Sequence, residues 1–438
     1  AHDNTAIGVG ALGVMDGGLG KNIAVGNYSG DAITTGGSNN MLGYQAGTAI
    51  TTGSNNNFFG TMAGKSTTTA DFNCGFGQEA LEANSTGAYN IAMGYLALTT
   101  NTTGSYNVAL GYGCLALNTT GQRNIAIGDR AGYAITTGEY NMAIGYASLF
   151  KITDASHNTA IGSDALHNAT TASYNVAVGN SALLGVTTGG SCTAVGYKAG
   201  YSNSTSGQNT FIGYRAGQDA NSSDVTYIGF DSGLHATGSS NTCVGHRTMD
   251  ATSCVSSNNT AIGREALGKL TTGANNTAVG YFAGRETLGG DNNLTLGYDA
   301  YPSGSGSSNE VTFGNSSISA IRCQVQSISS LSDERDKTDI VDMPLGLNFV
   351  NKLRPVKFKW NIRDAVSDNP HQGRVRGGFI AQELKAAQEE SDATFIDLVH
   401  ENNPDKMEAK QGNLIPVMVQ AIKELSAKVE ELESKLNN

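Results

Sequence analysis

The sequence predicts a mainly β protein, in which a shaft built as a β-solenoid or β-roll of 17-residue coils is followed by a small α/β domain that ends in a coiled-coil helix. Three observations support this fold class. A glycine that follows an apolar residue recurs about every 17 residues up to residue 314. Of the 65 Lys, Arg, Asp and Glu residues, 34 lie in the last 107 residues. Apolar residues near the C-terminus follow a heptad repeat.

The predicted domains follow from these three features. Residues 1–314 form the shaft of about 19 coils, residues 315–331 a transitional β segment, and residues 332–438 a separate domain with a coiled coil over 413–436. The glycines that define the coils are separated by steps of 16 to 18 residues, a period typical of solenoids and repeat arrays. These repeat glycines are Gly8, Gly26, Gly43, Gly60, Gly77, Gly94, Gly111, Gly128, Gly145, Gly162, Gly179, Gly196, Gly213, Gly229, Gly245, Gly263, Gly280, Gly297 and Gly314.

Each position of the repeat has a physical interpretation. The residue before the repeat glycine is always apolar, as in Ile7, and we expect it to face inward from a strand. The residue three positions after it is nearly always Ala or Ser, as in Ala46, which predicts close packing. The glycine itself suits a sharp bend or a positive φ. At about 4.8 Å per coil, the shaft would be about 90 Å long.

Asparagine stands four residues before the repeat glycine in sixteen of the nineteen copies. The exceptions are Cys192, Val225 and Glu310. Stacking would place these asparagines in a ladder, in which each amide bonds to the coils on either side. The recurring "TTG" segments are typical of turns.

Tyrosine follows the repeat glycine in eight copies, and these residues would form a stripe along the shaft. One interpretation is that the rings cover the coil or a subunit interface. The other is that the stripe faces a glycan, because amphipathic rings suit sugar binding. The stripe, called the Tyr stripe below, consists of Tyr44, Tyr95, Tyr112, Tyr146, Tyr197, Tyr214, Tyr281 and Tyr298.

Charge and hydropathy exclude two classes of partner. The net charge is -11 and no basic patch stands out, so nucleic-acid binding is not expected. No apolar run approaches the ~20 residues of a membrane helix, so no membrane insertion is expected.

Neither a metal nor another cofactor is expected. The six cysteines lack metal-site spacing and read as free, buried side chains of a protein assembled in a reducing cytoplasm. The "GVGALG" segment at residues 8–13 resembles a dinucleotide fingerprint, but its glycines belong to the 17-residue repeat and open no helix. Asp129, Asp164 and Asp231 read as solvated corner residues, although a catalytic site between chains stays open.

The C-terminal region predicts several elements. Residues 318–329 read as a short strand, 344–353 as a helix, 356–360 as a strand, 374–388 as a strand that leads into a helix, and 395–401 as a strand. The heptad repeat predicts association of the last helix with other copies but does not fix the number of chains. Its core positions are Ile415, Met418, Ile422, Leu425, Val429, Leu432 and Leu436.

Four segments of this region carry a resemblance to a known family. "SDERDKTDI", "LRPVKFKW", "GFIAQEL" and "LIPVMVQAIKELSAKVEEL" resemble the endosialidase-type intramolecular chaperone domain of phage tail fibres, tailspikes and neck appendages. The resemblance covers about residues 330–438 and implies a homotrimer whose C-terminal domain templates folding of the fibre and is then released by autocatalytic cleavage. The repeats are similar to the β-roll heads of trimeric autotransporter adhesins and to the shafts of phage fibres.

The resemblance also implies a Ser-Lys dyad. Ser332 would be the nucleophile and Lys337 the base, with cleavage at the Ser332–Asp333 bond. A lysine acts as a base only where burial or a nearby cation lowers its pKa; Arg335 would help, whereas Asp333 and its acidic neighbours would oppose this. Because Ser332 and Lys337 are five residues apart, a turn or a neighbouring subunit must bring them together. The alternative interpretation of this charged segment is a solvated linker.

The expected function is that of a structural and host-recognition fibre of a bacteriophage tail, located in the virion and assembled in the host cytoplasm. Expected partners are two further copies of the chain, a host cell-surface receptor (a glycan or a protein), and other virion tail proteins through an attachment region before Ala1. Only a single self-cleavage is expected, without turnover of an external substrate. The alternatives are a polysaccharide-degrading tailspike, with its catalytic part upstream or between chains, and a cellular surface adhesin.

Overall fold

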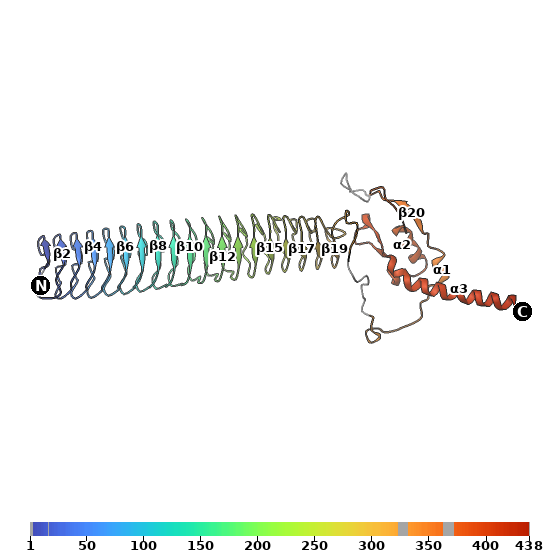
Figure 1. Cartoon of the computed structure of the whole chain (residues 1–438), viewed down its shortest axis with the longest axis horizontal. Helices are drawn as coiled ribbons and strands as arrows, with labels where there is room; N and C mark the ends of the chain where they lie inside the picture. The colour runs from blue at the N-terminus through green and yellow to red at the C-terminus, as the bar shows by residue number, and fades with distance from the viewer. Residues whose placement is uncertain (1–2, 16, 323–331, 362–371, 438) are drawn as a thin grey trace.

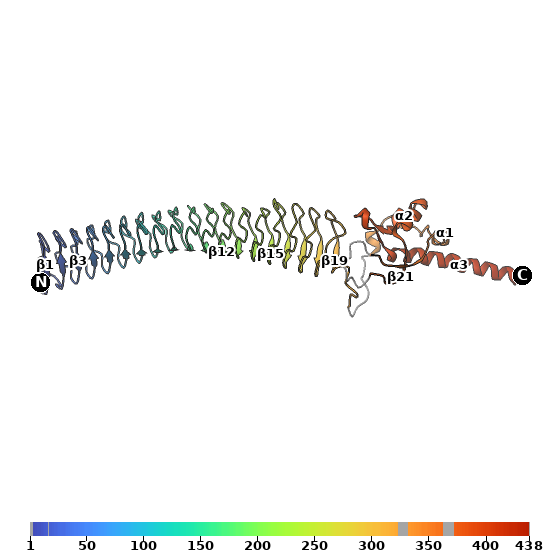
Figure 2. The ribbon, with the colours of Figure 1, turned by 90° about the horizontal axis from the view of Figure 1, so that it is seen from above.

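The computed structural model describes residues 3–15, 17–322, 332–361 and 372–437. Figures 1 and 2 show a long stack of coils that begins at the N-terminus, followed by a smaller domain from which the last helix projects to the C-terminus. The predicted fold class is confirmed, since the protein is mainly β and its shaft is a parallel β-solenoid with a period of about 17 residues. Residues 1 and 2 of the predicted shaft fall outside the described residues.

The shaft contains nineteen strands of three residues, and each pairs in parallel with the next strand along the chain. Their register repeats from coil to coil, so that Thr5, Ala6 and Ile7 lie opposite Ile23, Ala24 and Val25. The strands are β1 Thr5–Ile7, β2 Ile23–Val25, β3 Asn40–Leu42, β4 Asn57–Phe59, β5 Cys74–Phe76, β6 Ile91–Met93, β7 Val108–Leu110, β8 Ile125–Ile127, β9 Met142–Ile144, β10 Thr159–Ile161, β11 Val176–Val178, β12 Thr193–Val195, β13 Thr210–Ile212, β14 Thr226–Ile228, β15 Thr242–Val244, β16 Thr260–Ile262, β17 Thr277–Val279, β18 Leu294–Leu296 and β19 Val311–Phe313.

The middle residue of a shaft strand points into the coil, whereas the residue before the repeat glycine points outward. From β2 to β18 the middle residue is buried, as Ala24 and Phe58 are. Ile7 and Leu42, which precede repeat glycines, are 61% and 46% exposed. The prediction that this residue faces inward is therefore wrong. Successive strand residues alternate between faces, and the residue one position earlier, which is most often alanine, fills the interior.

The repeat glycines have the backbone conformation that the sequence predicts. Gly111 has φ +134°, and a Cβ atom there would lie 2.6 Å from the carbonyl oxygen of Gly128 in the next coil. A side chain at this position would therefore collide with the neighbouring backbone as well as strain its own. The coils can stack closely at this corner because glycine has no side chain.

The predicted asparagine ladder is confirmed. Asn107 Oδ1 accepts a hydrogen bond from the backbone N–H of Asn124 at 2.9 Å, and its Nδ2 donates to the carbonyl of Gly121 at 2.9 Å. The backbone N–H of Asn107 in turn donates to Asn90 Oδ1 at 2.9 Å. These side chains are buried, so the ladder satisfies polar backbone groups that water cannot reach.

We predict that Asn107→Ala lowers the free energy of unfolding of the shaft by about 2–3 kcal/mol. The substitution leaves the buried N–H of Asn124 without its side-chain acceptor, and that desolvation cost is the main loss. Urea unfolding followed by circular dichroism measures the effect. Asn180→Ala is the control, because Asn180 is exposed and its Oδ1 accepts from the hydroxyl of the adjacent Ser181 rather than from a buried backbone N–H. Equal midpoints for the two variants would contradict a stabilising ladder.

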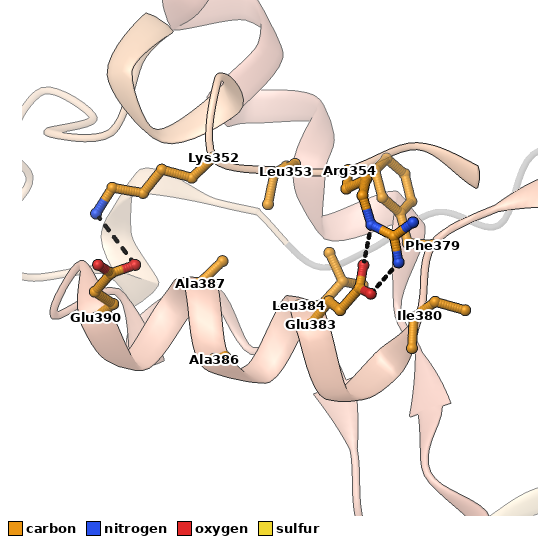
Figure 3. Close-up of a pocket in the computed structure, with 10 residues that line it drawn as sticks. All are labelled: Lys352, Leu353, Arg354, Phe379, Ile380, Glu383, Leu384, Ala386, Ala387 and Glu390. Atoms are coloured by element: carbon orange, nitrogen blue, oxygen red, sulfur yellow. Dashed lines mark hydrogen bonds and ion pairs between the residues drawn. The ribbon is translucent and has the colours of Figure 1, made fainter.

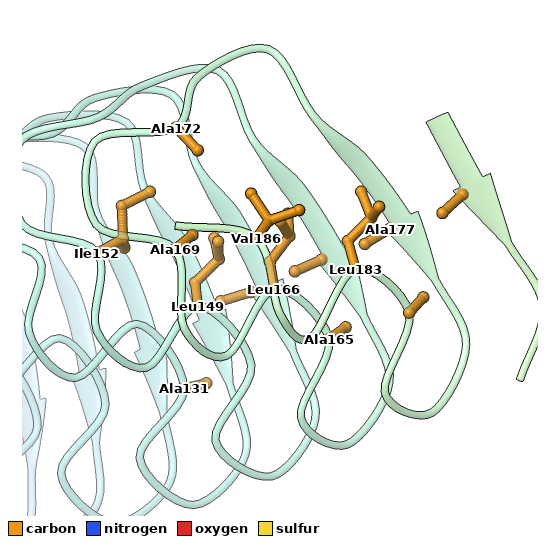
Figure 4. Close-up of a cluster of buried hydrophobic side chains, with 14 of the residues drawn as sticks. Ala131, Leu149, Ile152, Ala165, Leu166, Ala169, Ala172, Ala177, Leu183 and Val186 are labelled. Atoms are coloured by element: carbon orange, nitrogen blue, oxygen red, sulfur yellow. The ribbon is translucent and has the colours of Figure 1, made fainter. Parts of the chain in front are cut away.

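Inside the shaft, a large side chain at one position packs against a small residue at a neighbouring position. Where the middle strand residue is large, as Phe58 is, the position four residues after the repeat glycine is glycine, and a Cβ atom at Gly64 would lie 2.4 Å from the Phe58 ring. Where the middle residue is alanine, leucine usually fills the space. Figure 4 shows Leu149, Leu166 and Leu183 in successive coils, each at this position. Each coil is too thin to hold a core alone, so neighbouring coils share one.

The C-terminal domain packs a small core from short elements. Leu384, Leu398 and Val417 are buried in it. Glu424 of the last helix accepts a hydrogen bond at 2.8 Å from the backbone N–H of Leu347 at the start of α1, which holds these two helices together. The elements are η1 Glu334–Asp336, α1 Leu347–Val350, β20 Val356–Lys359, β21 Val375–Gly378, α2 Ala381–Glu390, η2 Thr394–Ile396, β22 Val399–His400, η3 Pro404–Lys406, β23 Glu408–Ala409, η4 Gln411–Leu414 and α3 Ile415–Leu436.

Of the strand predictions in this region, one is wrong over the residues that the structure describes, and another is only partly confirmed. Over residues 318–322 no strand forms, and residues 323–329 lie outside the described part of the chain. Of residues 395–401, only Val399–His400 are a strand, because a 3-10 turn occupies Thr394–Ile396 and Asp397 has φ +48°.

Of the five cysteines in the described segments, all are free; four are buried, as predicted, whereas Cys74 is only half-buried, and Cys323 falls outside these segments. Burial raises the pKa of the Cys114 thiol to about 11, which keeps it protonated and unreactive. Within the described ranges, no helix has the length and apolar character needed to cross a membrane.

Candidate functional site

The charged segment that follows the shaft folds into a turn that brings Ser332 and Lys337 together. Asp333 caps the short 3-10 helix η1, and its carboxylate accepts from the backbone N–H of Arg335 at 2.9 Å. The N–H of Lys337 then donates to the carbonyl of Glu334 at 3.1 Å and closes the turn. The expectation that a turn joins the two residues is met within one chain.

Lys337 Nζ lies 2.6 Å from Ser332 Oγ, a distance at which a proton can pass between the two groups. The same Nζ lies 3.4 Å from the carbonyl oxygen of Ser332. This carbonyl belongs to the Ser332–Asp333 peptide bond. A neutral Lys337 amine could therefore take the serine proton, and in its protonated form it could face the oxygen on which negative charge develops.

Arg335 does not help Lys337 in the way that the sequence suggested. Its guanidinium forms a two-pronged ion pair with Asp333, with Nη2–Oδ2 at 2.6 Å and Nε–Oδ1 at 3.0 Å. The hydrogen bonds from Arg335 lower the pKa of the Asp333 carboxyl. The two charged groups of this pair bind each other, and their contact stabilises the turn.

This Ser332–Lys337 turn is fully accessible in the single chain, since every residue from Ser332 to Asp342 is exposed. A lysine in water keeps its proton at neutral pH, and a lysine covered by protein can lose it. The geometry of a dyad is therefore present, whereas the desolvation that a lysine base requires would have to come from a covering surface.

The Tyr stripe is exposed, and two of its three pairs in successive coils are stacked, whereas the rings of Tyr95 and Tyr112 are tilted by 33° to each other. The exposed fractions of its tyrosines range from 38% to 60%. Tyr197 and Tyr214 stack at 5.2 Å between ring centroids, and Phe230 and His246 extend this stack. A sugar ring binds to an open aromatic face. Stacked neighbours cover faces in the Tyr197–Tyr214 and Tyr281–Tyr298 pairs, whereas among the described residues no ring stacks on Tyr44 or Tyr146. The covering role and glycan contact therefore both stay predictions.

A second row of stacked rings was missed by the sequence analysis. It occupies the position immediately before the ladder asparagine, so the same 17-residue step could have revealed it. Its successive ring centroids lie 5.0 or 5.1 Å apart, and the Arg123 guanidinium fills the one place without a ring. The row consists of Phe72, Tyr89, Tyr106, Arg123, Tyr140, His157 and Tyr174.

Of the three aspartates expected to be solvated, Asp231 is not. Its side chain is 1% exposed, and Arg215 binds both carboxylate oxygens, at 2.7 and 2.9 Å. A buried charge of this kind is retained because it is paired. Asp129 and Asp164 are partly exposed, with ion-pair contacts to Arg130 and His167. Within the described ranges, no group of three or more His, Cys, Asp or Glu side chains could hold a metal ion.

Asp250 lies beside the buried Arg215–Asp231 pair, and its own contacts offset little of the cost of burying its carboxylate. One of its carboxylate oxygens, Oδ1, is buried without a hydrogen-bond partner in the described part of the chain, and Arg247 Nε lies 3.7 Å from the other oxygen. Burial, and then the charge of Asp231, raise the pKa of Asp250 to about 6. The folded shaft therefore binds a proton at Asp250 more tightly than the unfolded chain does.

We predict that Asp250→Asn stabilises the shaft at pH 8 by roughly 1–2 kcal/mol. Because the pKa is raised on folding, the wild type loses stability as the pH rises from about 4 through 6, and the asparagine variant does not. Urea midpoints at pH 3.5 and pH 8 measure the difference, with the half-exposed Asp129→Asn as control. An equal difference in urea midpoint between wild type and Asp250→Asn at both pH values would contradict a raised pKa at Asp250.

The predicted heptad positions form one exposed face of α3. The exposed fractions of the seven residues range from 44% to 84%. The opposite face carries Val417 and Ala421, which are buried against the domain. The last helix thus has one apolar face that the chain itself covers and one that it leaves open.

A cavity of about 330 Å³ lies between α2 and the segment that precedes β20 (Figure 3). Apolar side chains that include Leu353 and Leu384 line it. Ion pairs cross it on two sides, Lys352 with Glu390 and Arg354 with Glu383. The second pair joins the "LRPVKFKW" and "GFIAQEL" segments at the surface of the domain.

A family model described as the chaperone of endosialidase matches residues 332–393. The match begins at Ser332 and contains the Ser332–Lys337 turn, α1, α2 and the strand pair β20–β21. No curated protein and no solved structure matched the chain. A β-solenoid shaft joined to this C-terminal region is the arrangement of a tail fibre with a C-terminal chaperone.

Proposed function

We propose that the protein is the shaft of a bacteriophage tail fibre that binds the host surface, assembled as a homotrimer in the host cytoplasm by its C-terminal domain, which then cuts itself off beside Ser332. The observation that carries this proposal is the match of residues 332–393 to a chaperone family, directly after a shaft of nineteen near-identical coils. Attachment to other virion tail proteins and contact with a glycan or protein receptor belong to the same proposal.

The outward apolar surface of the shaft supports assembly from several chains. We define the apolar ridge as the nineteen residues that immediately precede the repeat glycines. It runs from Ile7, which is 61% exposed, to Phe313, which is 55% exposed; all of its residues are apolar, nine of the nineteen are exposed and the other ten are half-buried. An extended row of apolar residues at the surface is typical of an interaction site. Other copies of the chain would cover it, and the resemblance to trimeric fibres gives the number three.

Such a shaft needs help to align its chains. Every coil offers an apolar ridge residue at the same position, so two chains displaced by one coil lose little of their contact. A domain that first joins three C-termini raises their effective concentration and gives all chains a common starting point. The exposed heptad face of α3 provides the surface for that first step.

Self-cleavage would proceed as an acyl transfer. Lys337 takes the proton of Ser332 Oγ, which attacks the carbonyl carbon of the scissile bond; the C–N bond then breaks, the proton passes to the amine of Asp333, and water hydrolyses the ester. Within one chain, Oγ of Ser332 could reach its own carbonyl only through a four-membered ring. Cleavage of the Ser332–Asp333 bond therefore requires the Oγ atom of a neighbouring copy, which would also cover the exposed Lys337.

Expression of residues 1–331 without the C-terminal domain tests the proposal. We expect aggregates or short-lived species, whereas the full chain gives a soluble rod that resists trypsin. If residues 1–331 assemble alone into the same protease-resistant rod at the same yield, the domain is not needed to fold the shaft.

A further inference from the structure

The last coil of the shaft differs from all others at its ladder position. There, Glu310 replaces the asparagine, and its backbone N–H still donates to Asn293 Oδ1 at 3.0 Å. An asparagine amide both donates and accepts, so it can pass the ladder on to another coil, whereas a carboxylate only accepts. Glu310 is therefore the last residue of the ladder: its backbone N–H is bonded to Asn293, but its side chain cannot donate as an asparagine amide does.

The Glu310 carboxylate accepts four hydrogen bonds that come from two parts of the protein. Ser303 of the last coil donates through its backbone N–H and its hydroxyl, both at 2.7 Å. His400 Nε2 lies 3.0 Å and Asn402 Nδ2 lies 2.9 Å from the same Oε1 atom. These last two residues belong to the C-terminal domain and lie 90 and 92 residues further along the chain.

The donors from the domain are held firmly in place. His400 ends strand β22, in which Val399 is buried in the core of the domain. Asn403, next to Asn402, uses its Oδ1 to cap η3 and its Nδ2 to donate to the carbonyl of Ser303 at 2.7 Å. The domain therefore grips the last coil at two neighbouring points, Glu310 and Ser303.

Glu310 behaves as a buried acceptor in this contact. Its side chain is 12% exposed. Burial alone would raise its pKa, but the hydrogen bonds from Ser303, Asn402 and His400 outweigh burial and lower the pKa to about 2. The carboxylate is therefore ionised in the folded protein at any physiological pH, as its four donors require.

The segment that connects the shaft to the C-terminal domain is too long to fix the position of the domain against the last coil. From Glu310 to Ser332 the chain advances 22 residues, enough to span about 70 Å when extended. Figures 1 and 2 both show the C-terminal domain directly beyond β19. The contacts of Glu310 and Ser303 are hydrogen bonds that join the domain directly to the shaft.

We propose that Glu310, together with His400 and Asn402, is the dock through which the C-terminal domain fixes the position of the last coil, so that the shaft is built from this coil toward the N-terminus. This inference rests on the proposed chaperone function and names the site at which it acts. The domain holds the nineteenth coil, and every earlier coil takes its register from the coil that follows it.

The test measures refolding of full-length Ser332→Ala protein, in which the domain stays attached, from urea. The variant His400→Ala/Asn402→Ala removes the donors and leaves the shaft sequence intact. Its yield of trypsin-resistant shaft is expected to fall by about tenfold. Glu310→Asn, which restores the usual ladder residue, is expected to give the same loss, and the combined variant no further loss. His235→Ala is the control, because it removes a histidine–carboxylate contact with Asp219 inside the shaft.

The outcomes separate the dock from the chaperone function. If the His400→Ala/Asn402→Ala variant refolds at the control yield while residues 1–331 alone do not refold, the dock is wrong and the chaperone function stands. If residues 1–331 alone also refold, both are wrong. Additive losses from Glu310→Asn and from the domain variant would likewise overturn the dock, because they would mean that the two sides act separately.

Discussion

Ser332→Ala is expected to give a single intact chain, whereas the wild type gives two fragments, residues 1–332 and 333–438. The hydroxyl of Ser332 lies 2.6 Å from Lys337 Nζ and is the nucleophile of the proposed cleavage, so its removal leaves no atom to form the ester. Denaturing mass spectrometry of freshly expressed protein measures both products. The expected effect is complete loss of cleavage.

Lys337→Arg provides the matching test of the base. Arginine keeps the positive charge but stays protonated, so it cannot take the serine proton. We expect this variant to remain intact, while the control Lys352→Arg is cleaved like the wild type. Cleavage of Ser332→Ala, or cleavage of Lys337→Arg at the wild-type rate, would contradict the dyad.

The mass of the small fragment identifies the bond that breaks. A fragment that begins with Asp333 means cleavage at the Ser332–Asp333 bond, which needs the Oγ atom of a second copy. A fragment that begins with Ser332 means attack on the preceding carbonyl, which one chain can achieve through a five-membered ring.

The second large effect is expected from Ile422→Asp/Leu425→Asp, which places two charges on the exposed heptad face of α3. Ile422 and Leu425 are 66% and 51% exposed in the single chain, so the substitutions spare its own core. In an assembled trimer the same positions would be buried, where an unpaired carboxylate is strongly unfavourable. We expect the yield of soluble, trypsin-resistant shaft to fall by at least about tenfold.

Ala427→Asp/Ser434→Asp is the control for this experiment. It adds the same charge at helix positions that lie on the outer side of the heptad. We expect it to leave both assembly and cleavage unchanged. Equal yields for the heptad variant and this control would show that α3 does not bring the chains together.

Much of the shaft could be predicted because one period fixes every coil. The 17-residue step placed all nineteen strands, the asparagine ladder and the positive φ of the repeat glycines. It could not decide which strand residue points inward. Ala24 and Val25 are both compatible with a core, and in a strand of three residues a shift by one exchanges the faces. The small interior that selects alanine appears only when the coils are stacked.

The candidate site was predictable only in part. Resemblance identified Ser332 and Lys337, and their separation predicted a turn. The pairing of Arg335 with Asp333 depends on the direction of one side chain, which a sequence does not give. The contact of Glu310 with His400 joins residues 90 positions apart without a motif, and its one signal was that Glu310 breaks the asparagine pattern.

The most direct test of the central claim, that the C-terminal domain assembles the shaft from three chains, is the native mass of the shaft after cleavage. Native mass spectrometry of the wild type is expected to give a particle with three copies of residues 1–332, and intact Ser332→Ala protein is expected to give three full chains. A folded, trypsin-resistant shaft with the mass of a single chain would contradict the claim.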